Sequence, residues 1–180
     1  RRKYSISEYK EKLMMVKDYF PSAGIGADII TGSKGTDNVR LGENAGNSIT
    51  SGGTNNVTIG KNAGTAITTG DNNTAVGTSS LSAVTTASNN TALGYNSLLA
   101  NTTAMSNTAV GYEAMKACTT GQRNVAVGYQ ALVANTEGNY NCALGAYSAY
   151  TSSTAINNTA LGYIALYTAS SGSNNTCVGY

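Results

Sequence analysis

The sequence has no histidine and no tryptophan, and it has a single phenylalanine and a single proline. Without histidine the chain cannot form a Ser-His or Cys-His nucleophile, which excludes the hydrolases that depend on one. Large apolar side chains are also too few for the core of an ordinary globular domain of 180 residues. These absences favour an architecture with a thin interior over an enzyme.

Charge is scarce as well, and it is unevenly distributed. Residues 1–37 carry seven Lys or Arg and five Asp or Glu, whereas residues 38–180 carry four of each. The neutral second region offers no positive surface for nucleic acid or anionic lipid. No apolar run is long enough to cross a membrane. The sequence therefore predicts no nucleic-acid partner and no membrane insertion.

Groups that could carry chemistry are scattered along the chain. The carboxylates of residues 38–180 are Glu43, Asp71, Glu113 and Glu137. They fall at unrelated positions, so no acid–base pair is expected. The cysteines Cys118, Cys142 and Cys177 are 24 and 35 residues apart, a spacing that fits neither a metal site nor a disulfide framework. We interpret them as small space-filling residues and predict no catalytic residue, metal or cofactor.

A five-residue word, N-[V/T/C]-x-[L/I/V]-G, recurs through most of the chain. Its last residues are Gly42, Gly60, Gly77, Gly94, Gly111, Gly128, Gly145, Gly162 and Gly179. The first step, from Gly42 to Gly60, is one position longer than the steps that follow, which all equal the step from Gly60 to Gly77. A fixed period of this length is typical of solenoids. We expect an all-β solenoid or β-roll of about nine 17-residue coils over residues 38–180, preceded by one α-helix.

Stacking such coils at about 4.8 Å would align identical residues in rows. Asparagine tolerates turn geometry and can bond its amide to the next asparagine in the stack. Glycine suits a bend where φ is positive or a side chain would clash. The predicted ladder residues are Asn73, Asn90, Asn107, Asn124, Asn141 and Asn158, with Gly77, Gly94, Gly111, Gly128, Gly145 and Gly162.

Alternation along the word predicts which residues face inward. The aliphatic residue before the glycine and the Val, Thr or Cys two positions earlier share one face, which we expect to be the inner one. The residue between them is alanine in every repeat from Ala75 to Ala160. Small residues repeated on an outer face indicate close approach of another chain, so we expect a homotrimer. A second apolar patch after the glycine, such as Ala131-Leu132, predicts a second strand in each coil.

Tyrosines directly follow the glycine in several repeats, and two interpretations stay open. Stacked tyrosines could cover the rod and shield strand edges. Alternatively, an aromatic row could bind glycan or another surface, with Tyr95, Tyr112, Tyr129 and Tyr163 as the candidate residues. Paired threonines such as Thr119-Thr120 suggest an ice-binding array less strongly, because adjacent strand residues face opposite ways.

Residues 1–37 follow a different pattern. Ser5-Ile6-Ser7-Glu8 has the spacing of a capping box, and an apolar stripe with helical spacing runs from Ile6 to Phe20 before Pro21 ends it. Residues 24–31 read as a buried strand. Ile25-Gly26 also matches the end of the repeated word, so this stretch could form a degenerate first coil capped by the helix. The alternative is a detached arm.

The same region resembles a known enzyme family. R-R-K-Y-S-I-S-E-Y and M-M-V-K-D-Y-F-P-S-A-G-I-G-A-D-I-I-T-G are similar to one helix–strand unit of radical S-adenosylmethionine methylthiotransferases. The resemblance covers residues 1–32, and the three-cysteine motif that binds the family's cluster is absent. It implies that this piece was fused to the repeats, or was borrowed from the family and reused as a cap. The alternative is that the chain is a fragment of a methylthiotransferase fusion.

The repeats carry a second resemblance. N-N-T-A-L-G-Y-N-S-L and S-N-T-A-V-G-Y-E-A-M resemble repeats of phage tail fibres and fibrous bacterial adhesins and, more loosely, the heads of trimeric autotransporter adhesins. The resemblance implies an extracellular trimeric shaft that presents a receptor-binding region to a host glycan or receptor. The alternative is a module whose own surface binds glycan, ice or mineral. Because the chain ends within a word, at Val178-Gly179-Tyr180, we expect a piece of a longer protein.

Overall fold

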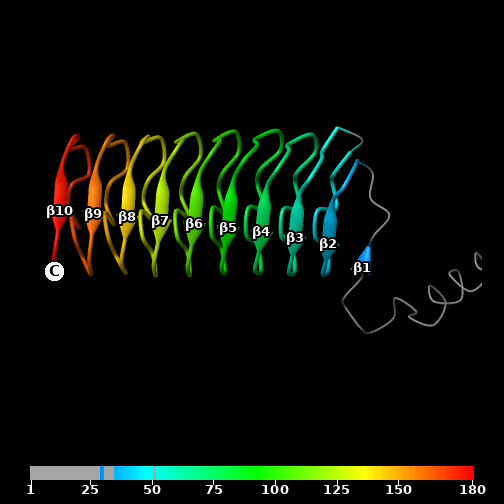
Figure 1. Ribbon diagram of the computed structural model, residues 1–180, viewed down its shortest axis with the longest axis horizontal. Helices are drawn as coiled ribbons and strands as arrows, with labels where there is room; N and C mark the ends of the chain where they lie inside the picture. The colour runs from blue at the N-terminus through cyan, green and yellow to red at the C-terminus, as the bar shows by residue number, and fades with distance from the viewer. Residues whose placement is uncertain (1–28, 31–34, 51) are drawn as a thin grey trace, which may run out of the picture.

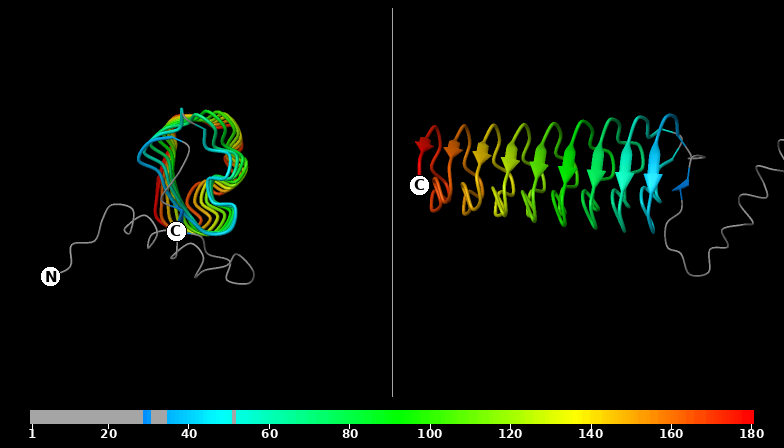
Figure 2. Two further views of the ribbon diagram at one scale, coloured as in Figure 1. Left: turned by 90° about the vertical axis from the view of Figure 1, so that its right-hand side faces the viewer. Right: turned by 60° about the horizontal axis from the view of Figure 1, so that its bottom comes forward.

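The computed structural model describes residues 29–30, 35–50 and 52–180. These residues wind into a solenoid whose coils stack along one axis (Figure 1). Viewed along that axis, successive coils lie almost on top of one another (Figure 2). The predicted helix and most of the region that resembles methylthiotransferases lie outside the described residues.

One three-residue strand from each coil joins a single sheet that runs the length of the rod. The strands are β2 (Val39–Leu41), β3 (Val57–Ile59), β4 (Thr74–Val76), β5 (Thr91–Leu93), β6 (Thr108–Val110), β7 (Val125–Val127), β8 (Cys142–Leu144), β9 (Thr159–Leu161) and β10 (Thr176–Val178). All nine are parallel and pair in register, so that Ala92, for example, lies beside Ala75 and Ala109. Nine strands enclose eight complete turns. The predicted all-β solenoid with a 17-residue repeat is confirmed.

Strand β1 (Ile29–Ile30) occupies the free edge of β2. It runs antiparallel to β2, with Ile29 opposite Leu41 and Ile30 opposite Arg40. The strand predicted over residues 24–31 is thus observed at these two residues. Their antiparallel direction means that they do not continue the parallel stack, so the interpretation as a degenerate first coil is wrong for them. Pairing with β1 covers an edge that would otherwise be open to other strands.

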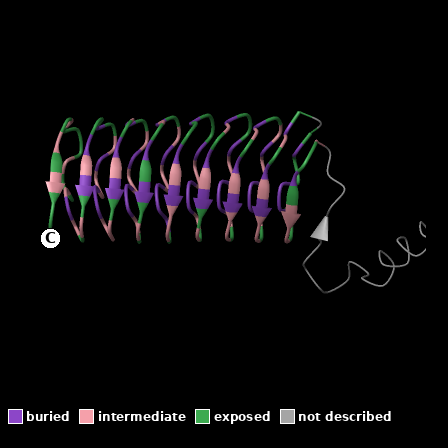
Figure 3. Cartoon of the chain, in the orientation of Figure 1, coloured by how far each residue is buried: buried purple, intermediate pink, exposed green. Residues whose placement is uncertain are grey.

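Each strand turns its middle residue into the solenoid. Ala75, Ala92 and Ala109 are fully buried, whereas the residues on either side of them are half-buried or exposed (Figure 3). Leu93, before the glycine, is 45% exposed. The prediction that aliphatic residues face inward and alanine outward is therefore wrong. From β4 to β9 the opposite wall leaves room only for the alanine methyl group, whereas in β3 the fully buried Thr58 faces Gly46 and Gly64.

The second strand predicted in each coil is also absent from the described residues. The segment that follows each glycine has a left-handed residue at every second position, as at Gln130 and Leu132, with φ of 51° and 49°. Such backbone is uncommon for non-glycine residues. It is held by bonds to the next coil, such as Leu98 N–H to the Ala114 carbonyl at 3.0 Å. This path turns Leu98 and Leu132 into the core, where both are fully buried.

Two rows of side chains from the opposite wall fill the interior. The first row holds the fully buried Leu81, Leu98, Met115 and Leu132. The second row begins with the apolar residues Ile49, Ile67 and Val84 and continues with Asn101, Cys118, Asn135 and Ser152, all buried. The second row therefore changes from apolar to polar along the rod.

Candidate functional site

A ladder of buried asparagine amides links every coil to the next. The Oδ1 atom of Asn107 accepts hydrogen bonds from the backbone N–H and the Nδ2 of Asn124, at 2.9 and 3.2 Å. The Nδ2 of Asn107 donates to the carbonyl oxygen of Gly121 at 2.8 Å. The backbone N–H to Oδ1 bond joins each neighbouring pair of asparagines from Asn38 to Asn175. These amides bind one another, so they hold the register of the coils and are not free to bind a ligand.

The glycine column holds the coils at close contact. Gly111 has a φ of 134°, and a Cβ atom placed there would collide with the carbonyl oxygen of Gly128 in the next coil. Each glycine from Gly77 to Gly145 meets the next one in the same way. A larger residue would need both a different backbone conformation and a wider gap between coils. The glycines therefore allow the close spacing of the coils, as the asparagines hold their register.

The candidate tyrosines form a column along one edge of the rod. The ring centroids of Tyr95 and Tyr112 are 5.3 Å apart, and those of Tyr112 and Tyr129 are 5.1 Å apart, with interplanar angles of 15° and 7°. The three rings are 42–48% exposed. Because each ring covers the face of its neighbour, the column presents ring edges and hydroxyl groups to solvent. This arrangement fits a shielding ladder better than a platform on which a sugar could stack.

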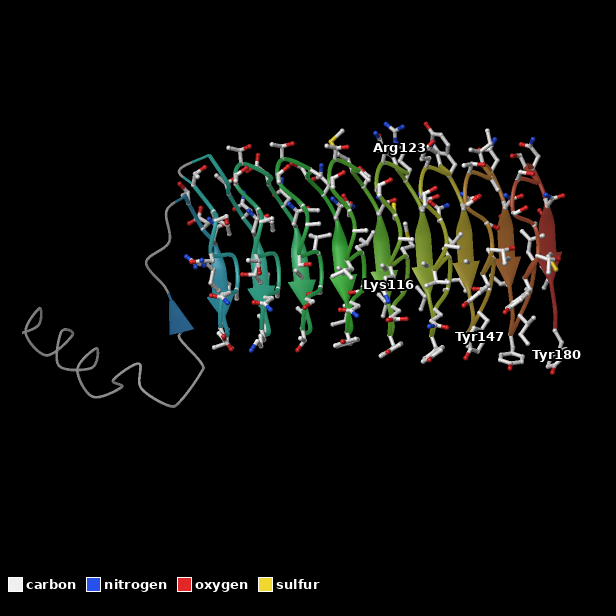
Figure 4. All side chains as sticks on the ribbon, turned by 180° about the vertical axis from the view of Figure 1, so that it is seen from behind. Lys116, Arg123, Tyr147 and Tyr180 are labelled. Atoms are coloured by element: carbon white, nitrogen blue, oxygen red, sulfur yellow. The ribbon has the colours of Figure 1, made fainter. Side chains whose placement is uncertain are left out.

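Tyr163, the fourth candidate, is separated from that column. The coil between them has Ala146 at the tyrosine position, and Tyr147, the next residue, fills the space. Its ring lies edge-on to Tyr129, at 5.2 Å and 65°, and to Tyr163, at 6.2 Å and 76°. Desolvation, together with the neighbouring Tyr129, raises the pKa of Tyr147. Figure 4 labels Tyr147 and Tyr180 on the same edge of the rod.

The outer face of the sheet carries an exposed aliphatic row beside a row of Thr, Val and Cys, and neither was predicted to face outward from the sequence. Its two rows are the first and third residues of strands β2 to β10, and no charged residue occupies either row. The exposed members of the row before the glycine are Leu93, Val127, Leu144, Leu161 and Val178, with exposed fractions of 37–72%. A contiguous exposed apolar surface is typical of sites where another molecule binds. The alternation of side chains along the repeated word would have predicted this face if the alanine had been assigned to the interior and the residues on either side of it to the surface.

In several turns the hydroxyl of the first threonine of a pair is engaged in a hydrogen bond. Thr102 donates to the carbonyl oxygen of Thr119 at 3.2 Å, and Thr119 donates to that of Thr136 at 3.1 Å. Each hydroxyl therefore caps a backbone carbonyl of the next coil. Thr103 and Thr120, the second residues of these pairs, are exposed, so the ice-binding alternative would rest on them.

The environments of Glu113 and Cys118 shift their pKa values in opposite directions. Lys116 and Gln130 bond the carboxylate of Glu113 at 2.7 and 2.8 Å, and these hydrogen bonds lower its pKa. Burial raises the pKa of Cys118 to about 12, so this thiol is unreactive near neutral pH. Within residues 29–30, 35–50 and 52–180, no cluster of three His, Cys, Asp or Glu could hold a metal ion, and no helix is long and apolar enough to span a membrane.

Comparison with protein-family models, curated proteins and solved structures finds no match for this chain. The identity that the structure supports is therefore architectural, a β-solenoid with a 17-residue repeat. Its candidate functional surfaces are the tyrosine column and the outer face of the sheet.

Proposed function

We propose that this chain is a segment of a stiff extracellular shaft, in a phage tail fibre or a bacterial cell-surface adhesin, that presents a receptor-binding region to its host. The uninterrupted stack of β2 to β10 is the observation that carries this proposal. Strand, asparagine and turn hydrogen bonds join every coil to the next. Nine stacked strands at a spacing of about 4.8 Å make a rod roughly 40 Å long. Such a rod resists bending and proteolysis because no coil can open without breaking bonds to both neighbours.

We further propose that parallel copies pack through the outer face of the sheet, and the resemblance to trimeric fibres favours a homotrimer. The buried alanine row no longer supports assembly, but the exposed aliphatic row does, because burying it removes apolar surface from water. About 40 Å long and 10 Å across, this strip offers roughly 400 Å² per chain, against about 800 Å² in a standard interface. Assembly should therefore depend on many coils acting together, as a long shaft provides.

Cys142 provides a direct test, because it lies on the outer face between Val125 and Thr159 of the neighbouring strands. In a Cys177→Ser background, mild oxidation should link two copies through Cys142. Sedimentation should give a particle with three times the mass of the 18.4 kDa chain. A matched variant, Cys142→Ser with Thr120→Cys, moves the thiol to an exposed turn and should give no covalent dimer. A monomeric mass, or equal cross-linking from Thr120→Cys, would overturn the proposed homotrimer.

The alternative function, a rod whose own surface binds glycan, ice or mineral, draws on the exposure of the tyrosine column. Adhesion of the native protein to host cells or to a glycan array separates the two proposals. Tyr112→Ala with Tyr129→Ala should leave adhesion unchanged if the rod is a spacer. Loss of adhesion in a variant that stays folded and assembled would favour the surface-binding module instead.

A further inference from the structure

The tyrosine column places phenol rings of successive coils face to face. Tyr95, Tyr112 and Tyr129 stack with centroid distances of 5.3 and 5.1 Å. Tyr150 and Tyr167 form another stacked pair, with centroids 4.9 Å apart and an interplanar angle of 5°. The members of each pair are one repeat apart in the chain, so each pair bridges two neighbouring coils. Asparagine bonds and glycine contacts fix the spacing of these coils, so the rings are held close in the folded state.

We propose that these stacked pairs are sites of oxidative dityrosine cross-linking, which joins neighbouring coils covalently. The oxidant is hydrogen peroxide. A haem peroxidase uses it to take one electron and one proton from each phenol. The two phenoxyl radicals couple through ring carbons ortho to their oxygens and form one C–C bond. The hydrogens on those carbons then move to the oxygens and restore both phenols. Two tyrosines thereby lose two hydrogen atoms, and one peroxide becomes two waters.

The geometry meets the requirements of this coupling. Two rings that are already in contact react as one molecule, without the cost of bringing separate radicals together. The exposed ring edges give the oxidant access and let the phenol protons leave to water. The bond would close a loop between residues such as Tyr95 and Tyr112, which lowers the entropy of the unfolded chain as a disulfide does. Cross-linked coils should therefore resist unfolding better than coils held by hydrogen bonds alone.

Tyr140 is the internal control that separates geometry from exposure. It is 54% exposed, slightly more than the stacked rings. Its hydroxyl oxygen instead accepts a hydrogen bond from Arg123 Nη1 at 2.7 Å, and the guanidinium lies over its ring at 5.5 Å. No aromatic pair among the described residues includes it. A reaction governed by exposure alone should modify Tyr140 at least as readily as the column.

The test uses the full chain with horseradish peroxidase and hydrogen peroxide, followed by denaturation, proteolysis and mass spectrometry. We expect peptides joined through the stacked pairs, each two hydrogens lighter than the sum of its parts. Their yield should be independent of protein concentration. Dityrosine fluorescence is readable without interference because the chain has no tryptophan. The cross-linked protein should also unfold at a higher temperature than untreated protein.

Two phenylalanine variants make the assignment specific. Tyr112→Phe keeps a ring in the stack but removes the phenol shared by two pairs. It should abolish both of their links and leave the Tyr150–Tyr167 link intact. Tyr140→Phe should change nothing. Links to Tyr140 as abundant as those of the column, links whose yield rises with protein concentration, or no dityrosine at all would each overturn the proposal.

Discussion

The inner face of the sheet carries smaller side chains than the outer face. On the inner face, strands β4 to β9 present only alanine, and every one of these methyl groups is fully buried. On the outer face the same strands present Thr, Val, Leu and Cys. The opposite wall limits the depth of the inner face, whereas no described residue covers the outer one. In so thin a solenoid, the space available decides side-chain size, and burial does not require a large apolar residue.

Two leucines of one coil give the largest predicted contrast. Leu98 is fully buried and Leu93 is 45% exposed. Leu98→Ala should lower the free energy of unfolding by about 2–5 kcal/mol, because it leaves a cavity among packed side chains. Leu93→Ala should lower it by less than about 1 kcal/mol in dilute, unassembled protein. Urea denaturation measures both.

Protein concentration sharpens this contrast. If copies pack through the outer face, the effect of Leu93→Ala should grow with concentration, because the side chain is then buried between chains. The effect of Leu98→Ala should not change. Losses that are the same for the two variants at every concentration would contradict the assignment of Leu98 to the interior and Leu93 to the outer face.

Introducing valine on each face should have the next largest effect. Ala109→Val adds methyl groups to the closed inner face and should cost about 1–3 kcal/mol through overpacking. The neighbouring variant Thr108→Val changes the outer face and should stay within about 0.5 kcal/mol of the native protein. Thermal unfolding of the two variants gives the comparison. A tolerated Ala109→Val would show that the interior has room that the packing does not indicate.

The polar part of the second interior row contains two buried asparagines, Asn101 and Asn135, that differ in their hydrogen bonds. The amide of Asn101 bonds the backbone N–H and carbonyl of Ala104 at 3.1 and 3.2 Å, so Asn101→Ala should cost about 1–3 kcal/mol. Neither the oxygen nor the nitrogen of the Asn135 amide has a hydrogen-bond partner. Asn135→Ala should therefore be nearly neutral, because relief of the unpaired amide offsets the lost packing. A cost at Asn135 equal to that at Asn101 would contradict this explanation.

The two cysteines Cys118 and Cys142 differ in reactivity, and replacing either of them should not alter the free energy of unfolding at neutral pH. Cys142, on the outer face, should react with a thiol reagent in unassembled protein, whereas the buried Cys118 should react only after unfolding. The pKa of Cys118 rises from 9.0 to about 12, so the folded state keeps a proton that the unfolded state loses between these values. Stability should therefore fall as pH rises from about 9 toward 12. Cys118→Ala should remove that part of the fall, measured by urea denaturation across this range.

The architecture could be predicted from the sequence, but the orientation of its parts could not. The glycine steps predicted the solenoid and its period, and the predicted strands coincide with the repeated word. The faces were assigned wrongly because hydrophobicity was taken as the measure of burial. The patch at Ala131-Leu132 was assigned to a strand because Gln130 and Leu132 do not themselves mark left-handed backbone, although the equivalent Asn44 and Gly46 of the first coil favour it. The tyrosine row was visible, but its stacking and the intrusion of Tyr147 depend on ring positions in neighbouring coils.

By itself, the sequence determined the period, the rows of Asn and Gly, and the scarcity of charged groups and absence of histidine. Each of these follows from residue identity and spacing. The tertiary structure alone decided which face of each strand lies inside, since that choice depends on how much depth the opposite wall leaves. It also decided that Leu98 fills the core while Leu93, in the strand just before it, faces solvent. Two leucines of the same coil differ in burial because stacking, and not composition, divides interior from surface.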